Sequence, residues 1–121
     1  MKKLNMLGLV LAVAGAVSLP QLAQAHASLK NSAPAADSTV AAPKGIALTF
    51  NEKVEESFSA VTLKDAAGKE VSVSKPHVDT GDATTLRVDL PALSPGVYSV
   101  QWVAVGPDGH RRTGNFSFAV K

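Results

Sequence analysis

Alternation of apolar and polar residues with a period of two runs through most of the chain beyond residue 45 and constrains the fold more than any other feature. Turn residues such as Asp65–Gly68 and Leu93–Gly96 separate the alternating segments. The pattern predicts about seven short strands and no convincing helix, hence an all-β antiparallel sandwich or Greek-key barrel. The expected strands are a first edge strand near residues 26–33, then 46–50, 61–63, 70–73, 86–90, 97–105 and 116–120.

The first 25 residues have the composition of a secretory signal peptide. A basic start is followed by an apolar run at about residues 7–19, which is too short and too rich in alanine for a good membrane span. The segment ends in Ala23-Gln24-Ala25, a cleavage site of the A-x-A kind. We therefore predict a signal peptide at 1–25 and a single exported domain at 26–121 that begins at His26.

Cleavage changes the composition. Lys2 and Lys3 are two of the 12 basic residues, and none of the 10 acidic residues lies in the signal segment, so the mature chain has no formal net charge. This balance favours neither nucleic acid nor an anionic membrane as a partner. Both methionines, Met1 and Met6, leave as well, and the chain has no cysteine. Any metal site in the mature protein must therefore use nitrogen and oxygen ligands.

Two histidines and one aspartate stand out as candidate ligands. After cleavage, His26 carries a free α-amine beside its imidazole, which makes one residue a bidentate nitrogen donor. Asp108 and His110 are two residues apart, so extended chain places them on one side, and Gly109 allows a tight bend. Together they form an N,N,N,O set that suits Cu(II) or Ni(II); Zn(II) can use the same donors but prefers tetrahedral geometry.

Other polar residues have simpler interpretations. His77 lies in an expected polar loop at residues 74–84, where a solvated side chain is favoured over a second metal site. Glu52, with its neighbours Glu55 and Glu56, is interpreted as part of a solvated loop. The more specific alternative is that one of these carboxylates supports the metal ligands. Trp102 falls on the buried face of its expected strand.

Three stretches resemble one protein family. They are the start His26-Ala-Ser-Leu-Lys-Asn-Ser-Ala-Pro-Ala-Ala-Asp-Ser38, the strand Leu48-Thr-Phe-Asn-Glu-Lys-Val-Glu55, and Tyr98–His110 followed by Gly114-Asn-Phe-Ser-Phe118. Together they are similar to the CopC-type periplasmic copper-binding proteins. The resemblance implies a seven-stranded, Ig-like, cupredoxin-resembling Greek-key barrel. It also implies a Cu(II) site formed by the mature amine, His26, Asp108 and His110.

The resemblance also suggests a role and partners. It implies a periplasmic protein of copper resistance and homeostasis, often found beside a CopD-type inner-membrane protein. Some relatives carry a methionine-rich Cu(I) loop; the equivalent stretch here, residues 74–84, contains no methionine. We therefore expect a monomeric, non-enzymatic, Cu(II)-only protein that does not insert into the membrane after signal cleavage.

Two rival functions remain. An N-terminal histidine chelate with a second histidine resembles the histidine brace of copper mono-oxygenases, although Asp108 would fill a position that an oxidase needs open. An Ig-like adhesion or assembly module with incidental histidines is the other alternative. Copper-driven peroxide production would favour the enzyme, and copper binding no better than that of an unfolded peptide with the same start would favour the module.

Overall fold

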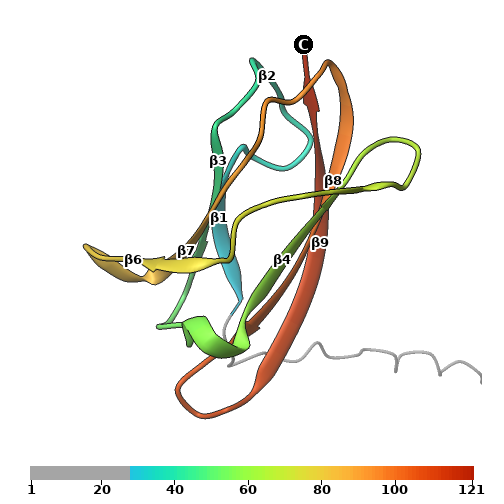
Figure 1. Cartoon of the computed structure of the whole chain (residues 1–121). Helices are drawn as coiled ribbons and strands as arrows, with labels where there is room; N and C mark the ends of the chain where they lie inside the picture. Colours follow the sequence, from blue (N-terminus) through green and yellow to red (C-terminus); the bar gives the residue numbers. More distant parts are fainter. Residues whose placement is uncertain (1–27) are drawn as a thin grey trace, which may run out of the picture.

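The computed structural model describes residues 28–121, which form two β-sheets packed face to face (Figure 1). His26 and the predicted signal segment lie outside the described residues. The four-stranded sheet has the order β1-β3-β7-β6, with β1 Leu29–Ala33, β3 Gly45–Phe50, β6 His77–Asp79 and β7 Asp82–Asp89. The five-stranded sheet has the order β2-β9-β8-β4-β5, with β2 Thr39–Val40, β4 Ala60–Lys64, β5 Glu70–Val71, β8 Gly96–Val105 and β9 Arg111–Val120. A 3₁₀ turn, η2, spans Glu56–Phe58.

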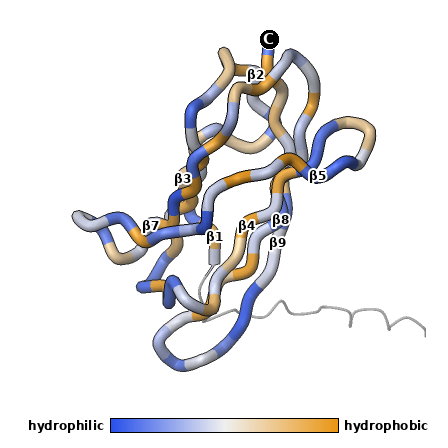
Figure 2. Tube along the Cα trace, in the orientation of Figure 1, coloured by the Kyte–Doolittle hydropathy of each residue, from blue (hydrophilic) through white to orange (hydrophobic). Residues whose placement is uncertain are grey.

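The core fills the space between the sheets, as the alternation predicts. Every second residue of β3, and every second residue of most of β8, is buried, and the intervening positions are exposed or half-buried. Figure 2 shows the apolar stretches along the strands and polar stretches in the loops, such as the one at β5. The fully buried large side chains are Ile46, Leu48, Phe50, Leu63, Leu86, Val88, Val100 and Phe118. Trp102 is 7% exposed, which confirms the prediction that it belongs to the core.

The all-β sandwich is confirmed, and the described part has nine strands where the sequence predicted about seven. The additions are β2 and β6, which have two and three residues and are too short to display alternation. β6 lies within the expected polar loop and pairs with β7 as a hairpin. β2 pairs in parallel with the end of β9, so the sheet is not purely antiparallel.

Strand β9 begins at Arg111, five residues before the expected start at Phe116. Its first half is polar, and the sequence pattern gives no strand there. The pairing with β8 nevertheless continues without a break from Gly96↔Val120 to Val105↔Arg111. Ladder hydrogen bonds to an established neighbour therefore override the weak local preference.

The first strand lies at a sheet edge, as predicted. β1 pairs with β3 alone, and Pro34, which lacks an amide proton, follows it directly. No helix within residues 28–121 is long and apolar enough to cross a membrane.

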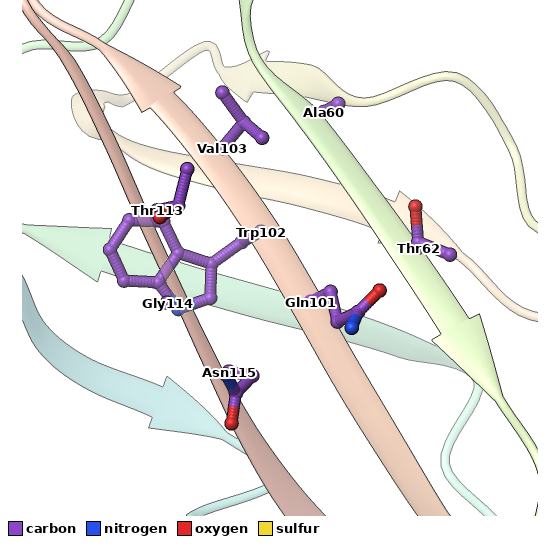
Figure 3. Close-up of a pocket in the computed structure, with 8 residues that line it drawn as sticks. All are labelled: Ala60, Thr62, Gln101, Trp102, Val103, Thr113, Gly114 and Asn115. Carbon is purple, nitrogen blue, oxygen red and sulfur yellow. The ribbon is translucent and has the colours of Figure 1, made fainter.

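Gly114 on β9 is required by the close approach of Trp102, its cross-strand neighbour on β8 (Figure 3). A Cβ atom at Gly114 would overlap the indole ring, which is enclosed by the core. Gly114→Ala should therefore lower the free energy of unfolding by about 1–3 kcal/mol through overpacking. Urea denaturation followed by Trp102 fluorescence measures this. The neighbouring exposed substitution Asn115→Ala is the control and should stay within about 0.5 kcal/mol of the parent. Equal stabilities for the two variants would contradict this packing argument.

Candidate metal centre

The hairpin turn between β8 and β9 carries the predicted Asp-Gly-His motif. The amide of Gly109 donates to the carbonyl of Gly106 at 2.9 Å, and the amide of Gly106 donates to the carbonyl of His110 at 3.3 Å. Gly109 has a φ of +83°, in the left-handed region where side chains are disfavoured. The glycine between the two candidate ligands therefore sets the tight bend that the sequence predicted.

Asp108 and His110 contact each other through both side chain and backbone. Asp108 Oδ2 lies 3.1 Å from His110 Nδ1, and Asp108 Oδ1 accepts a hydrogen bond of 3.0 Å from the His110 amide. Both side chains are about half exposed, so dissolved ions can reach them. The carboxylate thus fixes the turn and orients the imidazole, an arrangement that often accompanies metal-binding histidines.

A second carboxylate approaches the same turn from the loop after β3. Glu52 Oε2 lies 3.4 Å from the position that a Cβ atom on Gly106 would take, and Asp108 Oδ1 lies 3.3 Å from it. The two carboxylates therefore border the same glycine. The sequence analysis left the role of Glu52 open between a solvated loop residue and a supporting carboxylate. One feature of the sequence could have indicated this position: Glu52 follows the buried end of a strand, one residue beyond Asn51.

The start of β1 is tied to this loop. The Ser28 amide donates to Asn51 Oδ1 at 2.7 Å, and the Asn51 amide donates to the Ser28 carbonyl at 3.1 Å. The N-terminal end of β1, η2 and the β8–β9 turn accordingly lie at the same end of the sandwich (Figure 1). The described chain thus begins at the end of the sandwich that carries the Asp108–His110 pair.

The described residues hold only part of a ligand set. Within residues 28–121, no group of three or more histidine, aspartate or glutamate side chains has an arrangement that would hold a metal ion. Asp108 and His110 are brought together as predicted, whereas the third predicted ligand, His26, lies outside the described residues. A metal centre built on this pair requires at least one further donor.

His77 lies away from the β8–β9 turn, exposed on β6 opposite Arg87. The nearby acidic residues are engaged by protein groups. Arg87 Nε donates to Asp79 Oδ1 at 2.8 Å and holds the pKa of that carboxyl below its usual value. Hydrogen bonds from Thr84 likewise lower the pKa of Asp82. These contacts support the interpretation of His77 as a solvated surface residue.

A groove lies on the outer face of the five-stranded sheet (Figure 3). Cross-strand neighbours Thr62, Gln101 and Asn115 form one of its rows. Its lining contains no acidic, basic or histidine side chain, and so offers no general acid or base. The lining residues are Ala60, Thr62, Gln101, Trp102, Val103, Thr113, Gly114 and Asn115.

The fold, together with the end of the molecule that carries the β8–β9 turn, defines a class of protein. It is a small two-sheet β-sandwich with a carboxylate–imidazole pair in a hairpin turn at the end where its first strand begins. Residues 29–121 match the CopC domain. The chain is 41% identical over 106 residues to copper resistance protein C of Escherichia coli, covering 82% of this chain and 84% of that one. It is 39% identical over 124 residues to copper resistance protein C of Pseudomonas syringae pv. tomato, covering 98% of each.

A solved structure agrees. The crystal structure of PcoC, a methionine-rich copper resistance protein from Escherichia coli, superposes with a TM-score of 0.74 at 37% identity. The match covers 80% of this chain and all of the other. The chain therefore belongs to the CopC family, which confirms the resemblance.

The left-handed backbone at Gly109 gives a test of how the turn positions His110. Gly109→Ala should cost about 1–2 kcal/mol in folding and shift the turn, so that Asp108 no longer contacts the imidazole. The ¹⁵N chemical shifts of the His110 ring report the loss. Gly68→Ala is a matched control, because Gly68 has a φ of +82° in a different turn and equally open surroundings. It should carry a similar folding cost and leave the His110 ring unchanged. Identical ring shifts in both variants would show that Gly109 does not position the ligand pair.

Proposed function

We propose that this protein is a periplasmic Cu(II)-binding protein that sequesters or delivers copper in copper resistance. In the proposed site, Cu(II) is the cargo. Its donors are the α-amine and imidazole of His26, the imidazole of His110 and a carboxylate oxygen of Asp108. The protein acts by thermodynamic capture and not as an enzyme. Two named relatives of similar length are copper resistance proteins, which supports this role.

One observation carries the proposal. Asn51 holds Ser28 by two hydrogen bonds, and the next residue, Glu52, borders the turn that carries Asp108. Ser28 is only two residues beyond His26, and two residues of extended chain span at most about 7 Å. Covalent connection therefore keeps the mature N-terminus within about 7 Å of Ser28, at the end of the sandwich that carries the Asp108–His110 pair, with little chain to order when the ligands converge.

The donor chemistry fits Cu(II). The mature sequence has no sulfur ligand, and nitrogen and oxygen donors in a tetragonal arrangement suit Cu(II), which also leads the divalent affinity series. Asp108 Oδ2 and His110 Nδ1 lie 3.1 Å apart, close enough for both atoms to bind one ion once Nδ1 carries no proton. The other oxygen, Oδ1, can keep its hydrogen bond from the His110 amide while Oδ2 binds the ion.

The remaining parts of the proposal concern processing and partners. Residues 1–25 act as a signal peptide, and cleavage creates the amine ligand at His26. The absence of methionine from residues 26–121 distinguishes this chain from the methionine-rich PcoC and supports binding of Cu(II) alone. The mature protein works as a monomer, with a CopD-type inner-membrane protein as its partner in copper transfer.

The N-terminal ligand is tested by an EPR-monitored Cu(II) titration of two versions of the mature protein. One begins at His26, and the other has one extra glycine before it. The native start should give a single stoichiometric, nitrogen-rich tetragonal signal, and the extra glycine should weaken or alter it because the amine is displaced from the imidazole. Identical titrations would remove the N-terminal chelate and favour the adhesion-module alternative. Peroxide production by the copper form with ascorbate would instead favour the mono-oxygenase alternative.

The two remaining histidines of the mature chain provide a matched pair. His110→Ala should weaken Cu(II) binding by more than about 100-fold, since loss of a direct ligand exceeds the effect typical of outer residues. His77→Ala should leave the affinity unchanged, because His77 lies on β6 away from the turn. Competition with a chelator of known affinity measures both. Equal losses in the two variants would argue for nonspecific histidine binding.

The proposed ligands also predict a pH dependence. A protonated amine or imidazole nitrogen has no lone pair for a metal, so each such donor must release its proton to bind Cu(II). As the pH falls, protons compete with Cu(II) for these nitrogen atoms, and the affinity should decrease. Chelator competition between pH 8 and pH 5 measures the slope. An affinity that stays constant over this range is incompatible with the amine and imidazole ligands.

A further inference from the structure

Val105 is the last residue of β8, directly before the turn that carries Asp108 and His110. By register, the β4–β8 ladder ends at the pair Ala60↔Val103, because the chain before Ala60 leaves the sheet to form η2. Alternate residues of a strand direct their backbone groups to the same neighbour, so Val105 needs a new partner on this side. The segment around η2 supplies it.

Three hydrogen bonds join Val105 to this segment. The Glu55 amide donates to the Val105 carbonyl at 2.7 Å. The Val105 amide donates to the hydroxyl of Ser59 at 3.2 Å, and that hydroxyl donates to the Glu55 carbonyl at 2.8 Å. Both backbone groups of Val105 are thereby held, and the one side chain in this closed ring is the Ser59 hydroxyl.

Ser59 is only 8% exposed, so its hydroxyl group is held by other groups of the protein and is not a solvated surface group. Thr85 is the other buried polar side chain among residues 28–121. A buried amide without an acceptor is strongly disfavoured, so loss of the Ser59 hydroxyl would force Val105 to move or to admit water. Val105 pairs directly with Arg111, and together they form the base of the turn.

We propose that Ser59 is a positioning residue for the metal-binding turn. Its hydroxyl completes the hydrogen bonding of Val105 and so holds the base of the Gly106–His110 turn at a fixed distance from the start of β1. Asn51 and Glu52, which contact Ser28 and border Gly106, belong to the same stretch of chain as Glu55. The inference rests on the proposed copper function and extends it to a residue that touches no ligand.

The test compares Ser59→Ala with Thr85→Val in the mature protein. Each variant loses one buried hydroxyl, but that of Thr85 bonds Thr49 and Asp82 in the four-stranded sheet. Both variants should lower the Tm of the copper-free protein. Ser59→Ala alone should weaken Cu(II) binding, by about tenfold, and change the Cu(II) EPR parameters, as expected for a residue that supports the ligands from outside. Ser59→Thr, which keeps the hydroxyl on an extended backbone, should restore both.

A second measurement needs neither a stability comparison nor copper. In the copper-free parent protein the Val105 amide should exchange slowly with solvent, and in Ser59→Ala that amide and the amides of the turn should exchange faster. Fast exchange of Val105 in the parent would overturn the proposed hydrogen bond even if Ser59→Ala does not fold.

The experiments distinguish a failure of the positioning role of Ser59 from a failure of the copper function. If the parent binds Cu(II) and Ser59→Ala binds it with the same affinity and EPR spectrum, the positioning role is wrong while the copper function stands. If the parent itself gives no stoichiometric Cu(II) signal, the copper function fails, and the role of Ser59 in metal binding fails with it.

Discussion

The edge-on contact between Phe50 and Trp102 joins the two sheets at the end of the molecule that carries the candidate site. Their ring centroids are 5.0 Å apart at an interplanar angle of 70°, a favourable geometry for aromatic pairs. Phe50 is the last residue of β3, and Trp102 lies three residues before the end of β8. The segments that leave these strands, the loop after β3 and the β8–β9 turn, are therefore fixed relative to each other by the core.

Hydrogen bonds then convert this fixed spacing into a defined site. The loop after β3 bonds Ser28 through Asn51, and it bonds Val105 through the Glu55 amide and the Ser59 hydroxyl. This one loop thus connects the first strand of the fold to the turn between the last two. In a small sandwich with no disulfide, such contacts are the means by which distant parts of the chain reach a common point. Metal capture in the proposed function depends on this convergence, because ligands held near their bound positions lose little entropy on binding.

The sequence pattern predicted the core well and the short or polar strands poorly. Leu48, Phe50 and Val100 follow strict alternation, and burial of one sheet face enforces that period. Strand β2 and the first half of β9 carry no such signal, because their pairing comes from neighbouring strands and not from their own composition. The Asp108–His110 pair was predictable, since both the spacing and the intervening glycine are local features.

The sequence by itself determined the all-β class, the inward faces of the strands and the ligand types available within residues 28–121, which are nitrogen and oxygen donors. Those properties depend on residue type and on spacing along the chain. The tertiary structure alone decided that Glu52 borders Gly106 and that Ser59 supplies the acceptor for the Val105 amide. Ser59 and Val105 are 46 residues apart, and no local pattern marks a serine whose hydroxyl replaces a ladder partner. Such a role arises only where one strand ends before its neighbour does, and that is a property of the assembled sheet.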